Sequence, residues 1–213
     1  MAKRALSPWQ RKPDDMASVR EEKRLAVLKA GAAAFRERGF EKASLDDIAG
    51  KLGVTKPTLY YYITDKQDIV YACSALANGE LMALARSQDP RRPGLESLED
   101  FFRRYAEVIA GDFGYCLTMI NENLLPAPRV KELRRNKREL NSAVIAMLER
   151  GIADGSIAPC DTRLVSFALF GAFNWVARWH SGSSATTDKI AEVFMTLFTN
   201  GIAAQRQQRG DRR

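Results

Sequence analysis

The sequence predicts an all-α fold of about nine helices, with a small N-terminal unit and a larger C-terminal one. Apolar residues recur at steps of three and four through most of the chain, which is the period of a helix with one buried face. Capping residues, glycines and prolines separate these periodic segments. No segment shows the alternation typical of a strand, and the apolar stretch 164–177 is too short to span a bilayer.

Composition narrows the classes of function. The three cysteines are odd in number and never spaced as C-x-x-C, so we expect neither a disulfide framework nor a zinc site, and a cytoplasmic location fits. A single histidine, His180, argues against metal sites and against catalysis by a Ser-His or Cys-His pair. We expect no metal, no cofactor and no enzyme activity. The net charge of +7 indicates a polyanionic partner, either nucleic acid or an anionic membrane surface.

The N-terminal region begins with a basic arm at residues 1–17, which we expect to be flexible. Ser18 and Glu21 have the capping-box spacing, which predicts that a first helix begins there and runs to about Arg38. Gly39 ends this helix. The basic arm either has no specific contact or follows the negative potential of a DNA minor groove.

Two short helices follow, joined by a tight turn. Ser44 and Asp47 open the second helix, and Gly53 ends it by supplying a left-handed backbone conformation. Thr55 caps a third helix, which we expect to extend to about Ile63. Two short helices joined by a turn that contains glycine form a helix-turn-helix.

The rest of the chain predicts six more helices. Thr64 and Gln67 repeat the capping-box spacing and start a fourth helix that runs to about Arg86. The segment 87–94, rich in proline and arginine, is a predicted loop between the two units. The remaining helices are expected at 95–111, 115–124, 128–153, 161–180 and 186–206.

The third helix is the predicted DNA-recognition helix, because a major groove admits one α-helix. Lys56, Thr58 and Tyr60 are placed to reach base edges, whereas Tyr61 and Tyr62 are placed to contact phosphates. Packing alone remains an alternative for the tyrosines. The full set of candidate DNA-binding residues is Ser44, Thr55, Lys56, Thr58, Tyr60, Tyr61, Tyr62 and Lys66.

This region resembles the DNA-binding domain of the tetracycline-repressor (TetR) family. Two positions depart from the family pattern: Tyr62 stands where His is most frequent, and Ile63 where Phe is most frequent. The residues that carry the resemblance are Leu25 through Phe35, Gly39-Phe40, Ser44, Ile48-Ala49, Leu52-Gly53-Val54, Thr58 through Tyr62, and Lys66. The resemblance implies a homodimer that binds a palindromic operator.

The predicted domains are a helix-turn-helix domain at 18–66, a ligand-binding and dimerisation domain at 67–206 and a frayed tail at 207–213. The last two predicted helices are apolar on more than one face, so a second subunit is expected to cover one side. The family resemblance places a four-helix dimer interface there. The candidate interface residues are Phe167, Phe170, Trp179, Phe194, Leu197 and Phe198.

A ligand chamber is expected between the C-terminal helices, with apolar walls and a few polar groups. Packing in the core is the alternative for each of its residues. The segment 171–179 is similar to one in TetR-family members that govern fatty-acid or steroid catabolism, which implies a fatty acid, an acyl-CoA or another apolar effector. The candidate ligand-binding residues are Phe101, Phe102, Tyr105, Ile109, Met119, Asn121, Phe170, Asn174, Trp175 and Arg178.

The sequence thus predicts a ligand-responsive, sequence-specific transcriptional regulator that binds DNA as a dimer and acts as a repressor. One alternative is a non-specific architectural or membrane-surface protein. Another is a helical enzyme that uses carboxylates such as Glu122 or Asp112. A basic cluster at 129–138 is either a solvated helix face or an anchor for a phosphate-bearing ligand.

Overall fold

The structure, a computed structural model, describes residue 9 and residues 16–180 and 183–200. Within these residues it is all-helical, as predicted, with nine α-helices, a 3₁₀ turn η2 and no strand. The helices are α1 (Met16–Arg38), α2 (Leu45–Leu52), α3 (Lys56–Leu59), α4 (Lys66–Ser87), α5 (Gly94–Ala110), α6 (Gly114–Thr118), α7 (Ala127–Asp154), α8 (Thr162–Trp179) and α9 (Thr187–Asn200), and η2 spans Glu122–Leu124.

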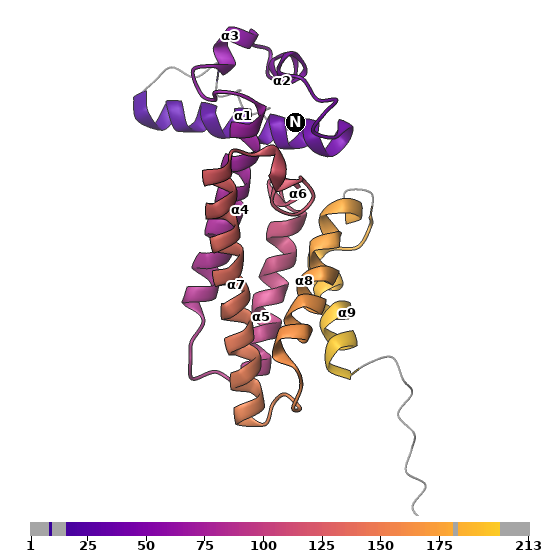
Figure 1. The fold of residues 1–213 in the computed structure, drawn as a ribbon. Helices are drawn as coiled ribbons and strands as arrows, with labels where there is room; N and C mark the ends of the chain where they lie inside the picture. The colour runs from indigo at the N-terminus through magenta and orange to yellow at the C-terminus, as the bar shows by residue number, and fades with distance from the viewer. Residues whose placement is uncertain (1–8, 10–15, 181–182, 201–213) are drawn as a thin grey trace, which may run out of the picture.

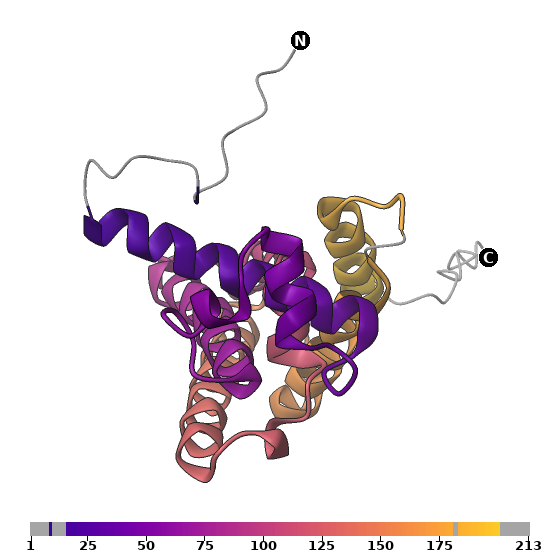
Figure 2. The same cartoon turned by 90° about the horizontal axis from the view of Figure 1, so that it is seen from above.

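The molecule has a head and an elongated body (Figure 1). The helices α1, α2 and α3 form the head, and α1 lies across one end of the body. The helices α4, α5, α7, α8 and α9 run along the body, with α6 directly below α1. Seen from above, α1 crosses over the ends of the body helices (Figure 2). None of the described helices is both long and apolar enough to cross a membrane.

The head is held together by a hydrophobic core that extends into the body. Leu28 and Phe35 of α1 pack with Ile48 of α2 and Leu59 of α3, and all four side chains are fully buried. The first half of α4 contributes Ile69 and its neighbours. Tyr115 and Cys116 of α6, Leu125 just after η2 and Leu133 of α7 belong to the same core. The head is therefore packed on the body and is not tethered by a loop alone.

The second core fills the body and centres on α5, which contacts α4, α6, α7, α8 and α9. Phe101, Phe102 and Tyr105 of α5 form an aromatic cluster with Phe173 of α8. The Phe102 and Phe173 ring centroids lie 4.7 Å apart, a favourable distance for an aromatic pair. This cluster fixes the spacing between α5 and α8.

Glycines allow α5 to approach α7 closely. A Cβ atom at Gly94 would lie 2.1 Å from the backbone nitrogen of Gly151, so no side chain fits there. The Gly94 amide donates to the Asp154 carboxylate at 2.7 Å, which helps to hold the start of α5 against the end of α7.

Several predicted helix boundaries are corrected by the structure. The first helix begins at Met16, so Ser18 lies inside α1 and is not its cap. The fourth helix begins at Lys66, and its cap is Asp65, whose carboxylate accepts from the Asp68 amide; Thr64 is not the cap. The carboxylate is a strong cap because, besides accepting this hydrogen bond, its negative charge interacts favourably with the positive end of the helix dipole.

Two predicted helices are shorter than expected. The third helix ends at Leu59 and not at Ile63. The reason is that the Tyr61 and Tyr62 amides donate hydrogen bonds to carbonyls three residues earlier, which tightens the chain into a turn. The predicted helix at 115–124 is divided into α6 and η2. The division occurs where Asn121 is extended and its side chain accepts from the Asn123 amide.

The other predicted boundaries agree within two residues where the chain is described. Most of the basic arm at 1–17, residues 201–206 of the last predicted helix, and the tail at 207–213 lie outside the described residues.

Candidate DNA-binding and effector sites

The turn between α2 and α3 has the geometry that a helix-turn-helix requires. Gly53 has φ +68°, a left-handed conformation that residues with side chains rarely adopt. The Gly53 amide donates a hydrogen bond to the Gly50 carbonyl, and the Val54 amide donates one to the Ala49 carbonyl. Together these two bonds form a Schellman motif, which ends α2 and sets the direction of α3.

The start of α2 is closed by the predicted capping box. The Asp47 amide donates to Ser44 Oγ at 3.0 Å, and the Ser44 amide donates to the Asp47 carboxylate at 3.0 Å. Hydrogen bonds from Ser44 lower the pKa of Asp47, which also pairs with Arg38 at 2.8 Å. The Ser44 hydroxyl donates to Asp47, so a DNA phosphate would meet the backbone amides of this helix end.

The turn that follows α3 presents two of the predicted contact residues to solvent. Tyr61 is 75% exposed and Tyr60 is 51% exposed. Both rings are therefore accessible to another molecule. Thr55 Oγ1 and Thr58 Oγ1 lie 2.9 Å apart, which orders the N-terminal turn of α3.

Lys56 stands at the start of α3 and pairs with Asp46 of α2 at 3.0 Å. This hydrogen bond raises the pKa of Lys56, so its ammonium group is charged at neutral pH. Both side chains are exposed, and such a surface pair contributes little stability. Lys56 can therefore exchange Asp46 for a DNA acceptor at small cost.

Lys66 and Tyr62 are tied to the protein itself. Lys66 Nζ donates to the carbonyls of Phe40 and Ala43, both at 2.9 Å, and lies 4.6 Å from the centre of the Phe40 ring. The half-buried Tyr62 ring meets the Trp9 ring edge-on, with centroids 5.4 Å apart. Lys66 thus holds the loop between α1 and α2 against the start of α4, and DNA contact by either residue remains a prediction.

Four of the eight predicted DNA-binding residues line one open groove in the head. The groove has a volume of about 590 Å³ and lies between the α1–α2 loop, α3 and the start of α4. Ser44, Lys56, Tyr60 and Lys66 line it. Lys42 and Gln67 line the same groove and were not among the predicted DNA-binding residues; Gln67 was singled out only for its capping-box spacing, and Lys42 by no motif.

A larger cavity of about 660 Å³ opens in the body between α4, α5, α6, α7 and α8. Its walls are partly apolar, and Tyr105 Oη donates to Asn174 Oδ1 at 2.5 Å. Asn78 lines the cavity, is 4% exposed, and its Oδ1 has no hydrogen-bond partner among the described residues. A buried acceptor without a partner is costly, so a ligand with a suitable donor would be favoured here.

The cavity brings together only part of the predicted ligand set. Tyr105, Phe170 and Asn174 line it. Phe101, Phe102 and Ile109 are fully buried in the core, in agreement with the alternative of packing, and Asn121, Trp175 and Arg178 are exposed. Met119 packs against both cores. Residues that the sequence analysis did not place in the ligand set also line the cavity, among them Asn78, Thr118, Asn141, Ile145, Arg163 and Phe167.

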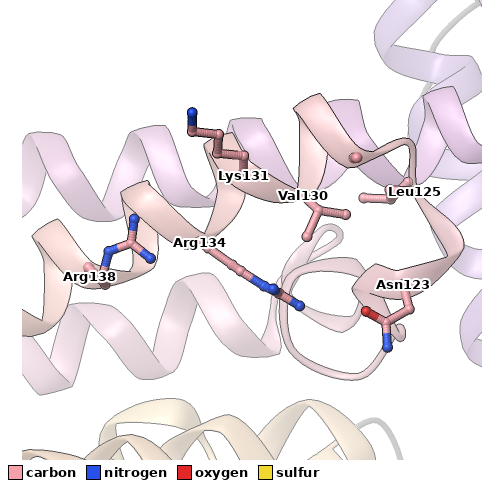
Figure 3. Close-up of a pocket in the computed structure, with 7 residues that line it drawn as sticks. Asn123, Leu125, Val130, Lys131, Arg134 and Arg138 are labelled. Atoms are coloured by element: carbon pink, nitrogen blue, oxygen red, sulfur yellow. The ribbon is translucent and has the colours of Figure 1, made fainter.

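A second cavity of about 400 Å³ lies over η2 and the start of α7 (Figure 3). Lys131, Arg134 and Arg138 line it, with Asn123 across from them. The basic cluster at 129–138 therefore does more than form a solvated face. Two other members of the cluster form ion pairs within the protein. Arg129 pairs with Asp68 of α4 at 2.9 Å and lies 4.6 Å from the centre of the Tyr71 ring. Arg135 pairs with Glu139 on its own helix.

The outer faces of α8 and α9 are strongly apolar. Leu164, Phe167 and Trp175 of α8 are 65%, 57% and 58% exposed, and they follow one face at helical spacing. Leu197 and Phe198 of α9 are also exposed, at 44% and 38%. Of the other predicted interface residues, Phe170, Trp179 and Phe194 are half-buried, and Phe194 packs on Phe173.

The carboxylates considered for an enzyme are both held by cations. Asp112 lies 2.8 Å from Lys29, and Glu122 lies 3.3 Å from Arg134 and 3.9 Å from Lys137. Within the described residues, His, Cys, Asp and Glu side chains form no group of three that could hold a metal ion.

The fold and these sites define a class: a helix-turn-helix protein with a separate helical body that contains a ligand-sized cavity. Comparison with protein families gives two matches. Residues 27–73 match the model for bacterial regulatory proteins of the tetR family, and residues 91–202 match the tetracyclin repressor-like C-terminal domain. The chain belongs to the TetR family and is a transcriptional regulator.

Individual relatives span nearly the whole chain. The HTH-type transcriptional repressor KstR2 of Rhodococcus jostii (strain RHA1) is 26% identical, over 90% of this chain and 97% of its own. The crystal structure of PfmR from Thermus thermophilus is 24% identical and superposes with a TM-score of 0.76, covering 84% of this chain and 99% of its own. The crystal structure of AibR in complex with isovaleryl coenzyme A and operator DNA is 18% identical and superposes with a TM-score of 0.70, covering 83% of this chain and 98% of its own.

The contacts of Lys66 lead to a prediction about stability. Replacing Lys66 with methionine removes charged hydrogen bonds to two loop carbonyls, so we expect the free energy of unfolding to fall by about 2 kcal/mol. Urea unfolding followed by circular dichroism measures the change. Lys42→Met, on the same loop but exposed, is the control and should unfold like the wild type. Equal stability of the two variants would show that the Lys66 contacts do not hold the head together.

Proposed function

We propose that this protein is a repressor that binds a palindromic operator as a homodimer and is released by an apolar or acyl-type effector. The observation that carries the DNA-binding part is the recognition helix α3, which is fixed by the Gly53 turn and bears Lys56, together with the exposed Tyr60 and Tyr61 in the turn that follows it. The relative in Rhodococcus jostii, named as a repressor, supports the direction of regulation. We expect a cytoplasmic protein without enzyme activity.

The dimer rests on the exposed apolar surface of α8 and α9. A large contiguous apolar surface on a soluble chain marks an interaction site. One recognition helix contacts few base pairs, whereas two helices one DNA turn apart, about 34 Å, read both halves of a palindrome. A second copy that covers Leu164, Trp175 and Leu197 would bury this surface and supply the second recognition helix.

The effector site is the cavity of about 660 Å³ in the body. AibR, which has the same fold, binds isovaleryl coenzyme A, and this supports an acyl-type compound as the effector here. The effector acts only through a difference in affinity between the DNA-binding conformation and a released one, and a coupling of about 1–3 kcal/mol is typical.

The helix α6 offers a physical route from the cavity to the head. Leu117 and Thr118 line the cavity, whereas Tyr115 and Cys116 are packed in the head core. Arg36 of α1 donates to the carbonyl of Gly111, just before α6, at 2.6 Å. An effector that displaces α6 would therefore move α1 and, with it, the recognition helix.

The recognition helix is tested by two substitutions in a gel-shift titration against the operator at fixed salt. Lys56→Ala should weaken binding by about tenfold, because it removes a charged contact. Tyr61→Phe should weaken it about threefold to tenfold, because it removes a hydroxyl that donates to a phosphate. Arg91→Ala, in the loop between α4 and α5, removes one charge far from the head and should have no such effect. Normal operator binding by both head variants would refute the assigned helix.

The dimer is tested by light scattering after size exclusion at micromolar concentration. The wild type should have the mass of a dimer, and Leu197→Glu should shift it toward the monomer, because a charge cannot be buried at an apolar interface without a partner. The matched control is Thr196→Glu, one residue earlier in α9, which lines a small surface cavity with Glu99 and Arg103 of α5. A monomeric wild type would contradict the proposed interface.

A further inference from the structure

The larger cavity of the body has a basic side that its apolar walls do not explain. Lys137, Arg138 and Arg163 line it together with Tyr105 and Phe170. Arg138 and Arg163 have no ion-pair partner within the described part of the chain. A purely apolar effector such as a hydrocarbon would leave these charges unused, whereas an effector with an anionic group would engage them.

Arg138 also lines the second cavity, over η2. The two cavities are therefore neighbours on α7 that share one arginine. Lys131, Arg134 and Arg138 follow one another at helical spacing along the face of α7 that borders this cavity. Seven residues of helix extend over about 10 Å, so the row of cations is long enough to meet more than one phosphate.

These cations are available for a ligand. Arg134 contacts Glu122 through Nε at 3.3 Å, which leaves its terminal Nη donors without a partner among the residues described. Lys131 has no ion pair in the same part of the chain. In Figure 3, the Arg134 guanidinium and the Asn123 amide extend into the space between α7 and η2. Guanidinium groups bind phosphate oxygens with two parallel hydrogen bonds, which gives both strength and geometry.

We propose that the cavity lined by Lys131, Arg134 and Arg138 binds the phosphate groups of the effector, while its acyl group occupies the larger cavity. The effector is then an acyl thioester of a phosphate-bearing carrier, of the coenzyme A type, and not a free fatty acid. Arg138 lies at the junction, where the carrier passes from one cavity into the other. This inference rests on the proposed effector site in the body and specifies the ligand of that site.

Isothermal titration of the full-length protein with octanoyl-coenzyme A, octanoate and coenzyme A tests the proposal. Octanoyl-coenzyme A should bind at least tenfold more tightly than octanoate, because only the thioester engages both cavities. The double variant Lys131→Gln, Arg134→Gln should lose at least tenfold of the affinity for octanoyl-coenzyme A and keep that for octanoate, because both residues line the cavity over η2 and neither lines the larger one. The control Arg135→Gln alters an exposed arginine of the same helix that lines neither cavity, and should bind like the wild type.

Three outcomes would overturn the proposal. These are equal affinities for octanoyl-coenzyme A and octanoate, an unchanged affinity in the double variant, and no binding of either coenzyme A compound. A gel-shift titration of the operator with the same protein separates this result from the proposed function. Operator binding that persists without coenzyme A binding would remove the phosphate site and leave the DNA-binding proposal intact.

Discussion

The two hydrophobic cores of this protein share the helices α4 and α6, and this sharing constrains everything else. Ile69 and Cys73 of α4 lie in the head core, whereas Ala77 and Leu81 of the same helix lie in the body core. Tyr115 and Leu117 of α6 are divided in the same way. Because packed interiors transmit displacement and do not absorb it, a change around the cavity cannot stay confined to the body. This shared packing is the physical basis on which we propose that the contents of the cavity influence the position of the recognition helix.

The head is built to transmit such a displacement as a rigid unit. The Schellman turn at Gly53 and the capping box at Ser44 fix the two ends of α2, and Lys66 fastens the α1–α2 loop to α4. A hydrogen bond with Cys116 and, after it, burial raise the pKa of Cys73, so this thiol in the head core stays neutral and acts as a small apolar group. The residues that face solvent on α3 can then contact DNA without reorganising the head.

The sequence was a good guide to features that depend on local chemistry. The glycine at position 53, the capping box at Ser44 and the helical periods predicted the helix-turn-helix and the all-α fold, because caps and turns are set by neighbouring residues. It was a poor guide to the cavity. Phe101 and Phe102 have the same character as Phe170, and only the packing of five helices decides which of them borders empty space. The packing of distant segments likewise decides that Arg134 and Arg138 line a cavity, so the sequence alone could not show it.

The coupling between the cavity and the head is tested most directly by the distance between the two heads of a dimer. A spin label at Ser18→Cys, an exposed position of α1 outside the groove of the head, in a Cys160→Ser background, leaves the two buried cysteines as the other thiols. Double electron–electron resonance then measures the distance between labels on the two protomers, first with operator and then with saturating octanoyl-coenzyme A. If the cavity and the head are coupled, the effector changes this distance as DNA is released. Release of DNA with an unchanged distance distribution would contradict this coupling.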